Sequence, residues 1–227
     1  MSDVLGCAIW DYHFNLNSKA KLWIHNKYGP KEEMPVKTYF RGAGEMPELE
    51  ITALDNCRGK ILDVGAGAGS HALLLQQKGL NVTALDVSPK ACEVIKMRGV
   101  KNVLTKDIYT FTGERFDTIL LLMNGIGLTG TILNLRLFLR HVKQLLLPGG
   151  QLIFDSSDVA YLYDGTPPAN NYYGEIDYEY RYKGERSDWF KWLYVDKALL
   201  AAIAEEEGWQ ATILFEDDFD QYLARLR

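Results

Sequence analysis

Cysteine is scarce in this sequence, with three in 227 residues. Cys7, Cys57 and Cys92 are widely separated, and their spacing matches no metal-ligand pattern. We therefore interpret all three as buried free thiols in a reducing compartment, and not as metal ligands. The sequence also has no internal repeat and no low-complexity tract. Its hydrophobic content of 47% suits one globular domain, or one domain with an appendage.

Long hydrophobic runs and an excess of positive charge are lacking as well. No stretch approaches the length of a membrane span, and the N-terminal residues show no basic segment followed by a long apolar one. The 25 Lys and Arg residues are outnumbered by 30 Asp and Glu residues, which gives a formal net charge of -5. A phosphate-backbone partner is therefore disfavoured. We expect a soluble cytoplasmic protein with no nucleic-acid partner and no membrane partner.

From Lys60 onward, short apolar runs alternate with helical segments. The apolar runs predict strands at 60–65, 81–86, 102–105, 116–122 and 151–155. The segments between them predict helices at 70–78, 88–99 and about 131–146. Short apolar strands separated by helices are typical of a parallel sheet covered on both faces. The fold class is therefore α/β, with a doubly wound, Rossmann-like sheet.

The last third of the chain departs from this alternation. In the segment IDYEYRY, Tyr178, Tyr180 and Tyr182 share one face, and charged residues share the other. The turn KGER and the segment DWFKWLYV follow, so residues 175–195 predict an antiparallel hairpin. Its tyrosines are typical of the packed face of a sheet. The hairpin can cover substrate, or it can pair with its copy in a homodimer, because exposed antiparallel edges pair readily.

The chain ends in a helix and two strands. Asp196 is a suitable N-cap for a helix over 197–207, and strands are predicted at 209–216 and 221–227. The turn DDFD between these strands is too short to hold a crossover helix, so the two strands must be antiparallel.

Residues before Lys60 have a different pattern. Gly29-Pro30 ends a segment that predicts a helix over 17–28, and Pro47 and Gly59 delimit a second helix over 46–59. We expect an N-terminal helical cap over 1–58 and a domain over 59–227. A hairpin insertion is expected in this domain at about 158–195.

The stretch KILDVGAGAGSHALLL joins the first strand of the alternating region to its helix. Gly65, Gly67 and Gly69 would bring a ligand close to bare backbone at a helix N-terminus. Asp63, directly before them, would repel a pyrophosphate, so the nearby part of the ligand is expected to be cationic. Ser70 stands at the sixth position of the dinucleotide fingerprint, where glycine is usual. Asp63 could also simply cap the loop.

At these residues the sequence resembles the class I S-adenosylmethionine-dependent methyltransferases, from about Lys60 to the C-terminus. The first family motif is matched by LDVGAGAG, and other segments match in order: ALDVS, TKDIYTF, LLPGGQLIFD, and the terminal pair ILFE and YLARLR. The resemblance implies S-adenosylmethionine as the cofactor. It also implies a seven-stranded, mostly parallel sheet that ends in an antiparallel terminal strand pair.

The resemblance further implies cofactor-binding residues. The glycine loop and Asp63 would hold the methionyl part, and Asp86 would bind both ribose hydroxyls. Asp107 would meet the adenine amino group, while Val87 and Ile108 flank the ring. Two alternatives stay open, because a carboxylate like Asp86 also occurs in NAD-binding proteins and Asp107 could be an ordinary turn acid.

Three more residues are placed with the cofactor. His71, one turn into the first helix, could reach the methionine carboxylate or be structural. Met123 ends the fourth strand, on the ligand edge of the sheet. Arg41, in the segment TYFRGAGE, could close over the cofactor or meet an anionic group of the acceptor.

Candidate acceptor residues follow the fourth and fifth strands. Asn124, in the loop MNGIG, is a catalytic candidate that could contact the acceptor or only pin the turn, and the two glycines of this loop indicate close approach to a ligand. Asp158 is the other catalytic candidate, as a base or as a cation-binding acid. Tyr172 and Tyr173 are candidates for a wall of the acceptor site, because aromatic rings beside an acid suit a planar or amine substrate.

Two subclasses of the family fit less well. Catechol-type members bind magnesium with acids after the fourth and fifth strands, but here the fourth strand ends in Met123-Asn124 and supplies no carboxylate. We therefore expect no metal. Enzymes that methylate nitrogen in DNA and in some proteins carry a Pro-Pro-aromatic motif where this chain has MNGIG.

The sequence therefore predicts a methyltransferase that moves a methyl group from S-adenosylmethionine to a small-molecule acceptor by direct in-line displacement. Such a transfer depends mainly on holding donor and acceptor in line. Two alternatives are an NAD(P)-dependent oxidoreductase on the same fold and a non-catalytic S-adenosylmethionine-binding protein.

Overall fold

The computed structural model describes residues 3–16, 19–163, 168 and 171–227. Within these residues one seven-stranded sheet is formed by β3 (Lys60–Val64), β4 (Asn81–Asp86), β5 (Asn102–Thr105), β6 (Phe116–Leu121), β7 (Leu146–Ser157), β11 (Ala211–Glu216) and β12 (Gln221–Leu226). The strand order is β11-β12-β7-β6-β3-β4-β5. β4 and β5 pair in parallel, as do β6 and β7, whereas β12 pairs antiparallel with β7 and β11. The predicted α/β class and antiparallel ending are confirmed.

The chain divides into two compact units. Unit 1 comprises Met1–Met46, Leu62–Phe111 and Asp177–Phe190. Unit 2 comprises Pro47–Ile61, Thr112–Ile176 and Lys191–Arg227. Each unit is therefore assembled from segments that are distant in sequence.

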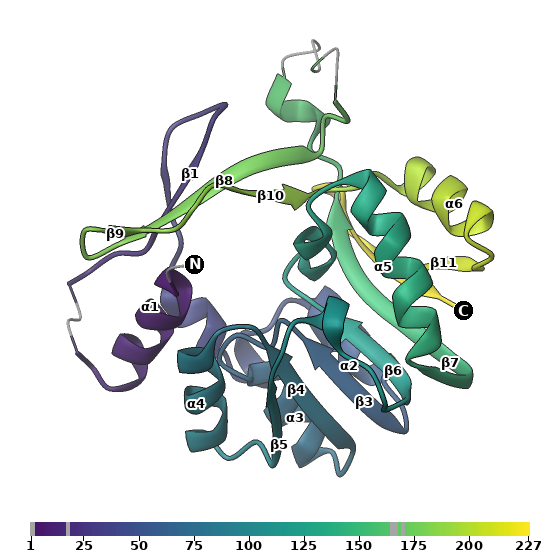
Figure 1. The fold of residues 1–227 in the computed structure, drawn as a ribbon, viewed down its shortest axis with the longest axis horizontal. Helices are drawn as coiled ribbons and strands as arrows, with labels where there is room; N and C mark the ends of the chain where they lie inside the picture. The colour runs from purple at the N-terminus through teal and green to yellow at the C-terminus, as the bar shows by residue number, and fades with distance from the viewer. Residues whose placement is uncertain (1–2, 17–18, 164–167, 169–170) are drawn as a thin grey trace. The chain divides into compact units, whose positions relative to one another are not determined.

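In unit 1 the predicted helices after the first two strands are confirmed as α3 (Ser70–Gln77) and α4 (Pro89–Met97). Ser88 caps α4 by accepting a hydrogen bond from Ala91 N–H, and Pro89 occupies the first helical position. A further helix, α1 (Val4–His13), was not predicted. It packs beside α4 (Figure 1), where Ile9 joins a buried apolar cluster.

The predicted helix over residues 17–28 is wrong. Residues 17–18 lie outside the described ranges, and the segment contains the strand β1 (Trp23–Asn26), which is followed by β2 (Glu32–Glu33). β1 pairs antiparallel with β2 at two positions and, over its whole length, with β8 (Glu175–Tyr182), a strand that is distant in sequence. Tertiary pairing overrides the local helical pattern here.

The hairpin prediction is confirmed. β8 turns at Lys183-Gly184 and pairs antiparallel with β9 (Glu185–Arg186), and β10 (Phe190–Leu193) follows. The second sheet has the order β10-β8-β1-β2, with β9 paired to β8. Tyr180 packs on Phe190 with ring centroids 5.0 Å apart, as expected for a packed face. Residues 164–167 and 169–170 of the predicted insertion lie outside the described residues.

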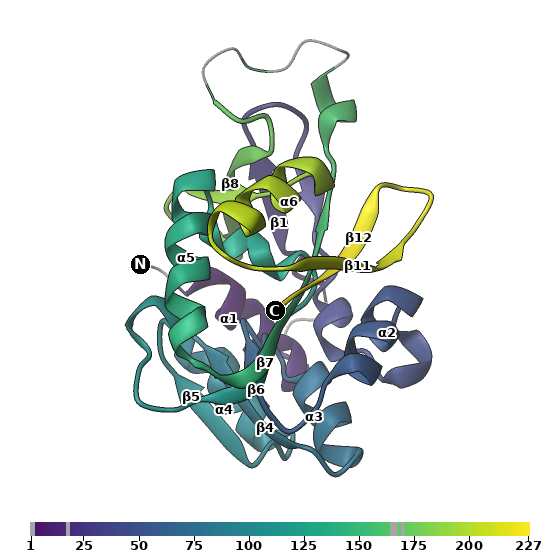
Figure 2. The ribbon, with the colours of Figure 1, turned by 90° about the vertical axis from the view of Figure 1, so that its right-hand side faces the viewer.

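Unit 2 contains α2 (Glu48–Asn56), α5 (Ile132–Gln144) and α6 (Lys197–Glu206), which confirm the remaining helix predictions. Arg140 Nε donates to Glu207 Oε2 at 2.6 Å, and this ion pair joins α5 to the end of α6, which lies beside it (Figure 2). Lys143 Nζ donates to the Glu207 and Gly208 carbonyls at 3.0 and 2.8 Å. Lys143 thereby provides hydrogen-bond donors to carbonyl groups at the C-terminal end of α6.

Cys7, Cys57 and Cys92 form no disulfide within the described residues, and the predicted burial is confirmed for Cys57 and Cys92, whereas Cys7 is half-buried. In the part of the chain that the structure describes, no group of three His, Cys, Asp or Glu side chains is placed to hold a metal ion. None of the helices within these residues is long and apolar enough to cross a membrane.

Candidate functional site

The turn between β3 and α3 is built from three left-handed glycines. Gly65, Gly67 and Gly69 have φ values of 71, 58 and 82°, which side chains other than glycine rarely adopt. A Cβ at Gly69 would lie 3.1 Å from Ile95, so this position is also crowded. A Cβ at Gly65 would have no described atom within 4 Å. The loop therefore presents open backbone at Gly65.

Asp86, at the end of β4, holds this loop in place. Its Oδ2 accepts a hydrogen bond from Gly67 N–H at 2.9 Å, and its Oδ1 accepts one from Ser88 N–H at 2.9 Å. Burial raises the pKa of Asp86, and the backbone N–H groups oppose that rise. Each carboxylate oxygen has two lone pairs, so the same carboxylate can also accept hydroxyl groups from a ligand.

Asp63 is a buried carboxylate with an unsatisfied oxygen. Its side chain is 1% exposed, and burial raises its pKa to about 6, opposed by His71 and by a hydrogen bond from Ala72 N–H. Its Oδ2 has no hydrogen-bond partner among the described residues. A buried charge without a partner is costly, so this oxygen is suited to a ligand cation or donor. The structure brings Asp63 and His71 together.

The predicted adenine-binding residues differ in exposure. Val87 directly follows Asp86 and is 66% exposed, so its apolar side chain is available to cover a ring. Ile108 is 3% exposed. Asp107 accepts a hydrogen bond from Tyr109 N–H at 2.9 Å and caps the 3-10 turn Ile108–Thr110. The turn role considered for Asp107 is therefore present, alongside any role toward a ligand.

The segment around Arg41 lies against the glycine loop through a residue that the sequence analysis missed. Arg41 directly follows the 3-10 turn Val36–Phe40. The ring of Tyr39, in this turn, lies 2.9 Å from the position that a Cβ at Gly67 would take. Arg41 itself contributes to the lowered pKa of Glu45, although the hydrogen bond from Lys37 is the larger cause.

In unit 2 the predicted residues Met123 and Asn124 form a strained turn after β6. Their φ values are 63 and 55°, although neither is a glycine. Asn124 N–H donates to Asp155 Oδ2 at 2.8 Å, and Gly125 N–H donates to Asp155 Oδ1 at 3.4 Å. Burial raises the pKa of Asp155 to about 6, opposed by these N–H groups. Asp155 holds the turn, a role that sequence reasoning did not assign.

The Asn124 side chain is fixed at one end only. Its Nδ2 donates to the Leu193 carbonyl at 3.2 Å, whereas its buried Oδ1 has no hydrogen-bond partner within the residues that the structure describes. The two glycines of this loop are closely approached by side chains of the protein itself. A Cβ at Gly127 would lie 2.0 Å from Trp192 Nε1, and one at Gly125 would lie 2.8 Å from Leu121.

The predicted acceptor residues Asp158, Tyr172 and Tyr173 do lie together in unit 2. Tyr173 donates to Asp158 Oδ1 at 2.8 Å, and the same oxygen accepts Ala160 N–H at 2.9 Å. Tyr172 donates to Asp196 Oδ2 at 2.8 Å. The two tyrosine rings lie 4.6 Å apart, and burial raises the pKa of both phenols. Asp196, which the sequence predicted only as a helix cap, is thus also the partner of Tyr172.

Comparison with known proteins adds a family context. The family profile described as "Methyltransferase domain" matches residues 62–154. A solved S-adenosylmethionine-dependent methyltransferase from Bacteroides fragilis, in complex with S-adenosyl-L-homocysteine, is 44% identical with a TM-score of 0.92. The match covers 99% of this chain and 94% of that one.

Curated relatives match shorter segments. Glycine N-methyltransferase of Rattus norvegicus is 27% identical over 139 residues, which cover 52% of this chain and 47% of that protein. Demethylmenaquinone methyltransferase of Tropheryma whipplei is 30% identical over 99 residues, which cover 41% and 40%. The chain therefore spans less than half of the length of these curated relatives.

The residues of unit 1 fit S-adenosylmethionine. The unpartnered Asp63 Oδ2 matches a ligand that carries an ammonium group, and Gly65 leaves open backbone beside it. Asp86 retains capacity for two hydroxyl groups, and exposed Val87 offers an apolar contact for a ring. A pyrophosphate would instead be repelled by the buried carboxylate.

Proposed function

This chain belongs to the S-adenosylmethionine-dependent methyltransferases and uses S-adenosylmethionine as its cofactor, and we propose that it transfers the methyl group to a small-molecule acceptor by direct in-line displacement. The alternatives of an NAD(P)-dependent oxidoreductase and of a non-catalytic binding protein are not favoured. Asp63 argues against a pyrophosphate at the glycine loop, and the matched relatives are named as methyltransferases.

Unit 1 supplies the cofactor-binding residues in this proposal. Asp63 accepts a hydrogen bond from the ammonium group, and His71 meets the carboxylate of the methionyl part. Asp86 accepts hydrogen bonds from the ribose hydroxyls while it continues to hold Gly67. Val87 covers one side of the adenine ring.

When bound, S-adenosylmethionine supplies a methyl group on a sulfonium, whose leaving group is a neutral thioether. The chain therefore does not need a covalent intermediate, and its residues act by binding and orienting the acceptor. Well-oriented contact can lower such a barrier by roughly 7–11 kcal/mol in the best cases. In this proposal Asn124 Oδ1 accepts a hydrogen bond from the attacking N–H or O–H group and orients it, and the proton is released to solvent. Met123 shares its strained turn.

The unpartnered amide oxygen of Asn124 is the observation that carries the acceptor role. A hydrogen-bond acceptor that is buried without a partner is suited to one donor group of a ligand. Tyr173 and Asp158 would line the acceptor site, with the phenol keeping the carboxylate in position. Small acceptors are also supported by the names of two relatives, which refer to glycine and demethylmenaquinone.

The experiment measures S-adenosylhomocysteine release with panels of small amines, small hydroxyl compounds, peptides and DNA. We expect turnover with a member of the small-molecule panels. Asn124→Gly keeps the left-handed backbone but removes the amide, so turnover should fall by about 100-fold. The dissociation constant of the Asn124→Gly variant for S-adenosylmethionine should change less than about threefold.

Asn15→Gly is the matched control, because Asn15 is an exposed asparagine with a φ of 55°. This variant should keep full turnover. Turnover with only peptides or DNA would overturn the small-molecule acceptor. Full turnover of Asn124→Gly would overturn the role of Asn124.

Two broader features complete the proposal. The N-terminal residues 1–58 act as a cap, and residues 59–227 form the methyltransferase domain with its insertion at about 158–195. The tyrosine-bearing hairpin covers substrate or forms a homodimer. Sedimentation equilibrium with and without cofactor separates these two roles.

A further inference from the structure

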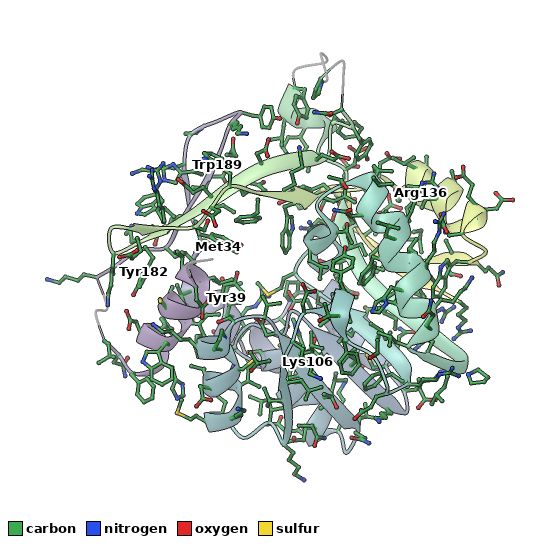
Figure 3. All side chains as sticks on the ribbon, viewed as in Figure 1. Met34, Tyr39, Lys106, Arg136, Tyr182 and Trp189 are labelled. Atoms are coloured by element: carbon green, nitrogen blue, oxygen red, sulfur yellow. The ribbon has the colours of Figure 1, made fainter. Side chains whose placement is uncertain are left out.

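Tyr39, in the Val36–Phe40 turn, packs against the glycine loop. Atoms Cδ1 and Cε1 of its ring lie 2.9 and 3.4 Å from the position of a Cβ at Gly67. Only a glycine leaves room for this contact. The phenol donates to Met34 Sδ at 3.6 Å, and Figure 3 shows Met34 and Tyr39 next to each other. Burial holds the pKa of Tyr39 well above its usual range, so the ring stays neutral.

The position of this ring is fixed by neighbouring contacts. Ser70 Oγ donates to the Tyr39 carbonyl at 2.8 Å, which ties the Val36–Phe40 turn to the start of α3. Arg98 donates to Ser70 Oγ at 3.1 Å and lies 4.9 Å from the centre of the Phe40 ring. The turn also packs on one buried cluster, formed by Ile9, Ala68, Ala91 and Val94. The ring is therefore held against the loop from several sides.

The chemistry of the cofactor indicates what this ring faces. Asp63 is suited to the ammonium group, and Asp86 to the ribose hydroxyls. In the covalent structure of S-adenosylmethionine the sulfonium stands between these two groups. Gly67 N–H donates to Asp86, and the Tyr39 ring packs against the α-carbon of Gly67. The ring therefore lies at the middle of the glycine loop, between Asp63 and Asp86.

We infer that Tyr39 is a cofactor-binding residue whose ring contacts the sulfonium and thereby favours charged S-adenosylmethionine over neutral S-adenosylhomocysteine. Aromatic rings attract cations at close range, which corresponds to a roughly 2- to 30-fold change in a dissociation constant. Loss of the positive charge on methyl transfer removes this attraction. The residue then promotes release of the product. The inference rests on the cofactor and not on the identity of the acceptor.

The test is calorimetric titration of the full chain with S-adenosylmethionine, S-adenosylhomocysteine and sinefungin, an analogue with a protonated amine near the sulfonium position. In Tyr39→Leu the dissociation constants of the two charged ligands should rise about tenfold. That of S-adenosylhomocysteine should rise less than about threefold. Tyr39→Phe keeps the ring and should bind all three ligands within about twofold of wild type.

Phe40→Leu is the matched control, because it removes the adjacent ring, which contacts Arg98. Loosening of the turn should weaken the binding of all three ligands by one common factor. The inference would be overturned if Tyr39→Leu raised the dissociation constants of all three ligands by one common factor, or left them unchanged. Melting temperatures establish that each variant is folded. These binding measurements need no acceptor, so their failure is distinct from failure of the acceptor proposal.

Discussion

Asp63 in unit 1 and Asp155 in unit 2 form an instructive pair. Both carboxylates are buried, at 1% and 8% exposure, and burial raises the pKa of each to about 6. They differ in their partners. Asp155 accepts backbone N–H groups with both oxygens, whereas Asp63 keeps Oδ2 without a partner among the described residues.

In our proposal this difference separates a structural carboxylate, Asp155, from a ligand-binding one, Asp63. The hydrogen bonds of Asp155 offset part of the cost of burying its charge and hold the strained turn at Asn124. Asp63 leaves part of that cost unmet until a cation binds. Residue type and burial are thus similar in the two places, and the unmet hydrogen bond is the reason why we propose Asp63, and not Asp155, as a ligand-binding residue.

The largest expected effect is on cofactor affinity. Asp63→Asn removes the charge that meets the ammonium group, so the dissociation constant for S-adenosylmethionine should rise about 100-fold. The free energy of unfolding without ligand should stay equal or increase, because a buried charge is lost. Calorimetric titration and thermal melting measure the two quantities. A clear loss of stability with unchanged affinity would make Asp63 structural.

Asp155→Asn should show the opposite pattern. An amide can present one oxygen but not two to the N–H groups of Asn124 and Gly125, so the free energy of unfolding should fall by about 2 kcal/mol. The affinity of the folded protein for S-adenosylmethionine should change less than about threefold. Denaturant unfolding gives the first value. If Asp63→Asn and Asp155→Asn both lose cofactor affinity, or both lose stability, the contrast between the two carboxylates is refuted.

The raised pKa of Asp63 predicts a pH effect on binding. Below about pH 6 the carboxyl takes up a proton and loses its attraction for the ammonium group. The dissociation constant should rise about tenfold between pH 7 and pH 5. In Asp63→Asn this part of the pH dependence should vanish. A wild-type profile that is flat over this range contradicts the assignment.

The same raised pKa has a defined effect on the stability of the ligand-free protein. The folded state takes up the proton near pH 6, whereas the unfolded chain does so near 3.8. The carboxyl therefore destabilises the protein above pH 6 by up to roughly 3 kcal/mol, and this penalty fades as the pH falls toward 3.8. Subtracting the Asp63→Asn unfolding profile from that of the wild type isolates the contribution. If the wild type instead loses stability relative to Asp63→Asn as the pH falls from 6 toward 3.8, a raised pKa of Asp63 is ruled out.

The smallest expected effect concerns an exposed side chain. Val87→Ala should raise the dissociation constant for S-adenosylmethionine about threefold, because it removes apolar contact with the adenine ring. Stability should change by less than about 0.5 kcal/mol. Leu133→Ala is the control, since Leu133 is 68% exposed on α5 and has no proposed contact with cofactor. Equal affinity of both variants would remove Val87 from the site.

Much of the alternating region could be predicted because its signals are local. Ser88 and Pro89 mark the start of α4, and the glycines after Asp63 form the turn between the predicted strand and helix, with positive φ values that favour glycine. That a cationic part of a ligand lies near Asp63 stays a prediction from charge, since a carboxylate beside a pyrophosphate is unfavourable.

The failures involve partners that are distant in sequence. β1 resembled a helix because its ladder depends on β8, and nothing near Tyr39 indicated its contact with Gly67. Asp155 is the last residue of the strand predicted over 151–155, but its hydrogen bonds to the turn at Asn124 depend on the pairing of β6 and β7. Patterns of period 2 or 3.6 carry no information about such contacts.

The pairing of β1 with β8 can form only late in the synthesis of the chain. Asn26 pairs with Tyr178, so about 150 residues must emerge before the N-terminal strand meets its partner. At roughly 5–20 residues per second, this takes on the order of 8–30 seconds. During that interval β1 can pair only with β2, and its other edge stays open on the ribosome, where chaperones and neighbouring nascent chains can reach it. Completion of the second sheet is therefore a late event in the life of each new molecule.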